Sequence, residues 1–306
     1  MAHSGSPEFD FALKILFGGV IAGIAKTIPA PIERVQLLLQ LQDAKKCMED
    51  PSKKYKGIIN CFSRVYKEQG LMSFWRGNLP NVIKFFPTQL CILAIKDNIE
   101  KLLPKYNPKT HFLNSFIMNS MSGGLAGCIS LCVSYPFDFI RTRMATDIGK
   151  NKSDREFLSM ADVVNKTMKT DGISGIYRGA SISMIGIFLY RFLYFGMIDT
   201  GKMTLFDDTT KSKFFLFWSF AQTITIFLRF ITYPLDTIRR KMMMQSGRNN
   251  MLYDNTIDCI AKIYMKEGGI KGFFKGAGCN VVKGTGGTMI MVYITNSKSS
   301  LDTSHQ

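Results

Sequence analysis

Two short motifs recur three times along this chain, always in the same order, and this repetition constrains the fold more than any other feature. The first motif is a proline followed two positions later by an acid, and it occurs as PIERVQLLLQ from Pro31, PFDFIRTRMA from Pro136 and PLDTIRRKMM from Pro234. The second has two glycines seven positions apart and ends in an aromatic–basic–glycine triplet, in segments 70–77, 172–179 and 269–276. Such internal repetition indicates similar units packed on one another. We therefore expect three units, over residues 1–108, 109–207 and 208–306, in one integrated domain.

The composition favours helices that cross a membrane over a large soluble core. Hydrophobic residues make up 46% of the 306 residues and charged residues only 20%. No charged residue occurs from 112 to 137, a run long enough to span the hydrocarbon core of a bilayer. Shorter apolar runs end at Lys or Arg, and charges within membrane helices are tolerated where they face a water-filled cavity. We therefore interpret the Lys and Arg residues at the ends of these apolar runs as functional.

Each repeat predicts an apolar helix that ends in the proline motif, a short amphipathic helix, the glycine element and a second apolar helix. The fold class is thus an all-α membrane protein with six transmembrane helices, expected near residues 11–40, 78–101, 111–144, 180–203, 213–244 and 277–298. The motif prolines should kink the odd-numbered helices toward a common axis. Acid and base three positions apart share one helix face, so the three motifs should meet in a ring of ion pairs. Close helix contacts are expected at Gly19 with Gly23 and at Gly123 with Gly127.

These motifs resemble those of the mitochondrial carrier family over nearly the whole chain. The run RRKMMM (239–244) is similar to the RRRMMM run of ADP/ATP carriers, and the stretches GNLPNVIKFFPTQ and IYRFLYFGMIDTGK add to the resemblance. The resemblance implies a monomeric exchanger of ADP and ATP in the inner mitochondrial membrane, with both termini on the cytosolic side. It also implies alternating access, with one central site between two gates and the short amphipathic helices on the matrix side.

The threefold repeat gathers cations at one depth. The glycine that ends each second motif is called its closing glycine, and seven residues past the closing glycines lie Lys84, Gly186 and Lys283. Five residues before the prolines of the first motif lie Lys26, Leu131 and Arg229. Four cations at one level of a water-filled cavity suit a polyanion such as ADP or ATP. A flat apolar slot beside an aromatic face is left by Gly186, Ile187 and Tyr190.

The resemblance independently puts the phosphates at Lys26, Lys84 and Lys283 and adenine in that slot. Alternatives stay open at this stage for single residues. Any one lysine near a helix end can snorkel to the interface, Tyr190 can serve ordinary packing, and Arg229 can pair with a nearby acid or carbonyl.

In the resembled family, the acid of each odd helix pairs with the base of the next odd helix at the matrix gate. Here Glu33 should meet Arg141 and Asp138 should meet Arg239, but the base of the first repeat is replaced by Gln36. Asp236 is therefore expected to meet only Gln36, with a weaker gate as the consequence. The alternative is that Gln40 braces the ring and that Arg34 or Arg240 substitutes for the missing base.

The same resemblance assigns a cytosolic gate and three lipid sites. The gate would use Asp97, Asp199, Lys202 and Lys298, although Glu100 and Thr295 depart from the pattern. Backbone N–H groups near Gly57, Gly77, Gly179 and Gly276 would hold cardiolipin phosphates at helix N-termini. Ser159 and Asn255 replace expected glycines, so two of these sites should be weakened.

The leading interpretation is an ADP/ATP exchanger with no cofactor beyond bound lipid, and not an enzyme. The alternatives are a broader adenine-nucleotide or phosphate carrier and a proton-leak carrier. A soluble nucleic-acid binder would fit the formal net charge of +16 but not the charge-free run. Seven cysteines without CxxC pairs or histidine partners predict neither metal site nor disulfide framework. The departures from the family pattern suggest a divergent lineage, one with a reduced mitochondrion-related organelle such as a mitosome.

Overall fold

The computed structural model describes residues 18–44, 54–102, 104, 106, 111–205, 211–247 and 251–280, and within them the regular structure is helical. A helix over residues 18–27 is followed by α2 (Ala30–Leu41), α3 (Ile58–Gln69), α4 (Asn78–Ile83), α5 (Phe85–Leu102), α6 (Phe112–Thr146), α7 (Met160–Ile176), α8 (Ala180–Leu205), α9 (Lys211–Met243), α10 (Thr256–Lys266) and α11 (Ile270–Phe273). Short 3-10 turns occupy Gln42–Ala44, Leu71–Trp75 and Lys152–Asp154. Of the sixth expected span, residues 277–280 are helical and the remainder lies outside the described residues.

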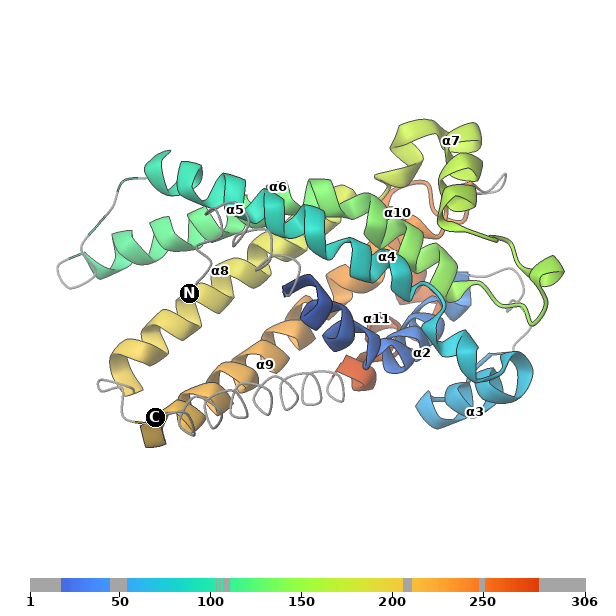
Figure 1. Ribbon diagram of the computed structural model, residues 1–306, viewed down its shortest axis with the longest axis horizontal. Coiled ribbons are helices and arrows are strands. Elements are labelled where there is room, and N and C mark those ends of the chain that lie inside the picture. Colours follow the sequence, from blue (N-terminus) through green and yellow to red (C-terminus); the bar gives the residue numbers. More distant parts are fainter. Residues whose placement is uncertain are drawn as a thin grey trace, which may run out of the picture.

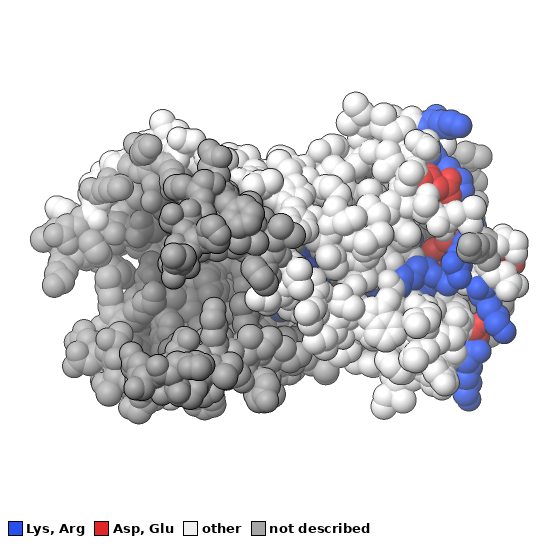
Figure 2. Space-filling view, viewed as in Figure 1, with Lys and Arg blue, Asp and Glu red and all other residues white. Residues whose placement is uncertain are grey.

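Long helices run along the molecule, and the short helices gather toward one end (Figure 1). The long ones are α5, α6, α8 and α9, and the end at which α3, α7 and α10 lie is called the short-helix end below. Lys and Arg side chains cluster at this end, whereas the middle of the visible face carries few charges (Figure 2). An uncharged belt beside a basic end fits a chain that crosses a membrane.

One helix in the described part is long and apolar enough to cross a membrane, over residues Phe116–Thr146. It contains most of the charge-free run that the sequence singled out. A bent pair, Met160–Ile176 with Ala180–Tyr194, meets the same criterion across an angle of 45°. The other long helices, α5, α8 and α9, also contain charged residues, among them Lys96, Arg191 and Arg229.

The motif prolines affect the three odd helices differently. In the first repeat, a turn at residues 28–29 separates the helix over 18–27 from α2, and Pro31 falls at the start of α2. At that position the missing N–H of proline is not needed, because the first helical donors have no partner within the helix. The other two odd helices continue through Pro136 and Pro234 without a break.

Glycines let neighbouring helices approach closely at Gly19 and Gly127, two of the four positions that the small-residue spacing predicted, whereas Gly23 has an ordinary contact of 3.4 Å. A Cβ added at Gly19 would lie 2.5 Å from Phe86, and one at Gly127 would lie 2.9 Å from Ile187. Gly124 adds a further contact of this kind, 2.6 Å from Phe188. Side chains of α5 therefore pack directly against the backbone of the helix over 18–27, and side chains of α8 pack in the same way against α6.

The closing glycine of each repeat packs on the motif helix of the next repeat. An added Cβ would lie 2.9 Å from the carbonyl oxygen of Arg141 at Gly77, 3.0 Å from that of Arg239 at Gly179, and 3.1 Å from that of Gln36 at Gly276. These contacted residues occupy the same motif position in repeats 2, 3 and 1. The three contacts, called the 1–2, 2–3 and 3–1 seams below, close the repeats into a ring.

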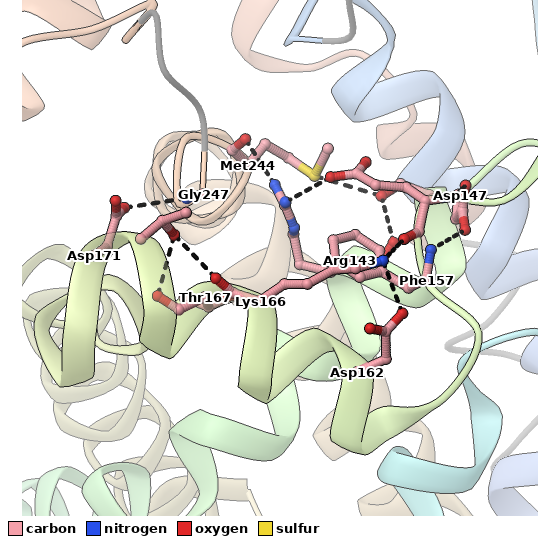
Figure 3. Close-up of polar contacts among 12 residues, drawn as sticks. Arg143, Asp147, Phe157, Asp162, Lys166, Thr167, Asp171, Met244 and Gly247 are labelled. Atoms are coloured by element: carbon pink, nitrogen blue, oxygen red, sulfur yellow. Dashed lines mark hydrogen bonds and ion pairs between the residues drawn. The ribbon is translucent and has the colours of Figure 1, made fainter.

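The 2–3 seam continues into a polar network at the short-helix end (Figure 3). The guanidinium of Arg143 lies 4.9 Å from the ring centroid of Phe157 and donates a hydrogen bond of 3.0 Å to the carbonyl of Met244. The N–H of Gly247 donates to the carboxylate of Asp171 at 3.1 Å. Repeat 2 thus holds the end of α9 through its own polar side chains.

Candidate functional site

Both ion pairs that were expected between motif helices are present. Arg141 on α6 pairs with Glu33 on α2, and Arg239 on α9 pairs with Asp138 on α6 at 2.7 Å. These pairs cross the 1–2 and 2–3 seams. Removing one partner of such a pair would leave an uncompensated charge, so both pairs are sensitive to substitution.

The third seam is closed differently, and the expectation that Asp236 meets only Gln36 is wrong. Asp236 pairs with Arg240 at 2.7 Å, one turn further along α9, which is the alternative named above. It also accepts a hydrogen bond from Gln40, whose amide nitrogen donates to Thr237 at 2.8 Å. Acid and base four positions apart on one helix meet without bending the backbone, so the nearby arginine satisfies Asp236.

Gln36 is buried at the 3–1 seam and contacts a tyrosine. Its side chain hydrogen-bonds to the hydroxyl of Tyr233, which in turn donates to the carbonyl of Lys275 at 2.7 Å. Gln36 is only 4% exposed, so this chain of bonds is sheltered from solvent. Neutral hydrogen bonds between the first and third repeats thus take the place of a third ion pair.

Asp138 is shared by two cations. One carboxylate oxygen accepts from Lys84 at 2.6 Å and the other from Arg239 at 2.7 Å. Lys84, predicted to hold phosphate, is therefore neutralised by an acid in this state. The second predicted phosphate residue, Lys26, donates to the carbonyl of Asn81 at 3.0 Å and lies 5.6 Å from the ring centroid of Phe85.

Four predicted binding residues line one cavity of about 220 Å³: Gly186, Ile187, Tyr190 and Arg229. Residues of the ion-pair ring form its other wall, including Asp236, Arg239 and Arg240. Lys26 and Lys84 lie outside this lining. The described part thus places the apolar slot beside arginines, and the two lysines on the side where repeats 1 and 2 meet.

Sequence reasoning missed a set of small polar residues, although the repeat could have revealed it. Four positions past the closing glycines lie Asn81, Ser183 and Asn280. Asn81 accepts a hydrogen bond of 3.1 Å from Arg141, and both Ser183 and Asn280 line the cavity. These residues lie one helical turn before positions 84, 186 and 283, so they share the face that points toward the site.

Several predicted residues are not placed in detail. Lys283 and Lys298 lie outside the described residues. Asp97 lies on α5, and Asp199 and Lys202 lie on α8. For these three residues the structure describes the backbone but not the side chain. The cytosolic gate therefore stays a prediction.

Three of the glycines predicted to bind lipid have a left-handed backbone that favours glycine, with φ of +82° at Gly77, +86° at Gly179 and +81° at Gly276. Gly57 precedes α3 without a side-chain cap. Its counterparts Ser159 and Asn255 do cap their helices, since each side-chain oxygen accepts a backbone N–H, at 3.2 and 2.8 Å. This is a physical reason to expect weaker phosphate binding before α7 and α10, because one donor is already used.

Five alternating charges join the first and third repeats at the short-helix end. Lys54 pairs with Asp43 at 2.7 Å, Asp43 with Lys275, and Lys241 with Glu267, which also lies 3.7 Å from Lys275. Burial alone would raise the pKa of Asp43, but hydrogen bonds from Lys275 and Lys54 hold that pKa down at about 2. This chain of charges adds contacts between repeats 1 and 3 at the short-helix end, beside the 3–1 seam.

The described residues contain no group of three or more His, Cys, Asp or Glu side chains that could hold a metal ion. The cavity is bordered by ion-paired residues of the ring and by Arg229. Such an arrangement can bind an anion and can rearrange its ion pairs.

Comparison with known proteins gives consistent matches. A family model described as "Mitochondrial carrier protein" matches residues 7–107, 113–209 and 212–301. "ADP,ATP carrier protein" of Parachlorella kessleri is 47% identical over 293 residues, which cover 95% of this chain and 86% of that protein. "ADP/ATP translocase 3" of Homo sapiens and "ADP/ATP translocase 2" of Rattus norvegicus are each 49% identical over 286 residues, covering 92% of this chain and 95% of theirs.

Proposed function

The chain belongs to the mitochondrial carrier family, and from that premise we propose that it exchanges ADP for ATP across the inner mitochondrial membrane. It is a multi-pass transporter and not an enzyme. The relatives give no support to a reduced organelle such as a mitosome, which the departures in sequence had suggested. The three repeat units over 1–108, 109–207 and 208–306 then form one integrated carrier.

The observation that carries the proposal is the cavity. It combines an apolar slot at Gly186, Ile187 and Tyr190 with arginine side chains, and residues of the ion-pair ring form its other wall. A purine fits an apolar, aromatic slot, and phosphates favour a cluster of cations. In this proposal Lys26, Lys84 and Lys283 hold the phosphates.

The ion-pair ring serves as the matrix gate, with the short-helix end facing the matrix and both termini on the cytosolic side. Opening this gate requires Glu33 to leave Arg141 and Asp138 to leave Arg239. A bound polyphosphate competes with Asp138 for Lys84 and so weakens the ring from within. The gate on the other side uses Asp97, Asp199, Lys202 and Lys298.

The surrounding lipid and the oligomeric state complete the proposal. Cardiolipin phosphates bind at the helix N-termini near Gly57, Gly77, Gly179 and Gly276, most tightly before α3, where no side chain caps the helix. The exchanger works as a monomer, because a single chain closes the whole ring.

Uptake of labelled ADP into liposomes that contain the purified protein tests the function. Liposomes preloaded with ADP or ATP should accumulate label, whereas liposomes that are empty or loaded with phosphate should not. Lys283→Ala should remove most exchange while the protein keeps its melting temperature, with Arg64→Lys on α3 as the matched control. Uptake into empty liposomes would contradict exchange, uptake against phosphate would favour the broader carrier, and near-normal exchange by Lys283→Ala would remove that residue from the site.

A further inference from the structure

We propose that Arg229 reads the edge of the nucleotide base, so that this carrier accepts diphosphates of 6-oxopurines, namely GDP and IDP, beside ADP. The inference rests on the proposed nucleotide exchange and specifies its substrate class. It is carried by the level of Arg229 in the cavity, by its lack of a partner among the described residues and by the donor chemistry of its side chain.

The register between α8 and α9 fixes the level of Arg229. The two helices run in opposite directions (Figure 1), and a Cβ on Gly186 would lie 3.6 Å from that of Leu235. Further from the short-helix end, Ile198 and Ile224 pack in one cluster, which continues the same register. At a rise of about 1.5 Å per residue, Arg229 lies within roughly 3 Å of the level of Tyr190 along the helix axes.

The cavity therefore has arginines at two levels. Arg229 stands beside the aromatic ring of the slot, whereas Arg239 and Arg240 lie about three turns further along α9, in the ion-pair ring. Of the predicted phosphate residues, Lys26 contacts another part of repeat 1, and Lys84 contacts α6. Neither of them lines this cavity. The slot for the base and Arg229 thus share one side of the site, away from Lys26 and Lys84, whereas Lys283 lies outside the described residues.

Arg229 makes no ion pair or hydrogen bond with any other residue that the structure describes. By contrast, Arg239 and Lys84 are held by Asp138, and Arg240 is held by Asp236. Arg229 is partly buried, so an unpaired guanidinium there is costly unless a ligand or water uses its donors. Within the part of the chain that the structure describes, the donor fork of Arg229 is therefore not committed to another side chain.

The chemistry of the fork favours 6-oxopurines. A guanidinium offers donors only, in a planar arrangement that suits two adjacent acceptors. Guanine presents such a pair at O6 and N7, and hypoxanthine has the same two atoms, whereas adenine has an acceptor at N7 but a donor at N6. Stacking against an aromatic face does not distinguish purines, so the contact at the base edge decides between them.

Competition for exchange tests the inference. Liposomes that contain the protein and are preloaded with ADP would take up labelled ADP in the presence of unlabelled ADP, GDP or IDP. For the native chain we expect GDP and IDP to inhibit at concentrations within about tenfold of ADP. In Arg229→Lys and Arg229→Leu, inhibition by GDP and IDP should weaken relative to ADP by roughly tenfold or more, as when one bidentate base contact is lost.

Arg229→Lys is the deciding variant, because it keeps the charge and loses the fork. If it retains native inhibition by GDP and IDP, or if Arg229→Leu weakens ADP and IDP equally, Arg229 contacts phosphate or supports the fold and the inference falls. Arg64→Lys should leave all three nucleotides unchanged. Should Arg229→Leu fail to fold, thermal stabilisation of detergent-solubilised Arg229→Lys by IDP and by ADP gives the same comparison. Rejection of GDP and IDP by the native chain overturns the inference alone, whereas absence of ADP exchange overturns the proposed function.

Discussion

Asp138 joins all three repeats through one carboxylate. It stands on the motif helix of repeat 2, and its two oxygens bind Lys84 of repeat 1 and Arg239 of repeat 3. Asp236, the equivalent acid of repeat 3, instead finds its cation Arg240 on its own helix. The ring is therefore unequal, with one acid that connects three elements and another that pairs locally.

This inequality predicts different effects of neutralising the two acids. Asp138→Asn removes the acid that holds both Lys84 and Arg239, and it should lower the stability of the state seen here by about 3–5 kcal/mol. Asp236→Asn should cost clearly less, because the pair it breaks lies within one helix. Melting temperatures of the two variants in detergent check the order, and equal losses would contradict it.

Gln36→Lys would restore the missing base but should not stabilise the ring, because Asp236 already has Arg240 and Gln40 as partners. Arg240→Gln alone should lower the melting temperature. Adding Gln36→Lys to that variant should recover much of the loss, since the new ammonium then finds an unpaired acid. A gain from Gln36→Lys in the native background would show that the local pair leaves Asp236 unsatisfied.

The choice between Gln36 and Arg240 could not be made from the sequence. The repeat makes Gln36 a candidate partner for Asp236, and Arg240 lies one turn away on the same helix. The outcome depends on side-chain rotamers and on the hydroxyl of Tyr233, which binds Gln36. The pairs of Glu33 and Asp138 were predictable because the repeat supplies a base at one fixed position. Sequence symmetry therefore predicts partners where the pattern is intact and loses them where it is broken.

At the scale of elements, the seams set how closely helices approach. The closing glycines lie against the backbone of the next motif helix, so the separation there is fixed by carbonyl and amide atoms and not by flexible side chains. The repeat predicted the long helices well because each apolar run is bounded by a motif. It did not predict the turn at residues 28–29, where Pro29 and Pro31 fall together in the first repeat alone.

Gly77→Ala should destabilise the 1–2 seam. The new Cβ would lie 2.9 Å from both the carbonyl oxygen of Arg141 and the amide nitrogen of Ala145, and a φ of +82° disfavours alanine as well. We expect a loss of about 1–3 kcal/mol in unfolding free energy. Gly23→Ala is the matched control, because its Cβ would lie 3.4 Å from Val82 and should be tolerated. Equal melting temperatures for the two variants would show that this seam can open without cost.

At the scale of the whole molecule, the five alternating charges at the short-helix end make stability depend on pH. The folded-state pKa of Asp43, about 2, lies below its unfolded value, so the acid adds stability above the unfolded pKa of about 3.9. This contribution should be lost as the pH falls from about 4 toward 2. Melting temperatures of the native chain and Asp43→Asn, compared from pH 7 to pH 3, should therefore converge as the pH drops below 4. A constant difference down to pH 3 would show that Lys54 and Lys275 do not hold the carboxylate.

The 3–1 seam also has a consequence for how the protein is made. Its contact between Lys275 and Asp43 joins residues 232 positions apart, whereas the ion pairs across the other seams span 108 and 101. A chain is synthesised from its N-terminus, and a contact with the last repeat cannot form before that repeat exists. Until the third repeat has folded against the first, the molecule is therefore an open arc of two joined repeats, with one edge of α2 uncovered. A chain truncated within its third repeat would leave that edge uncovered, and with it the amide side chains of Gln36 and Gln40 that repeat 3 otherwise binds.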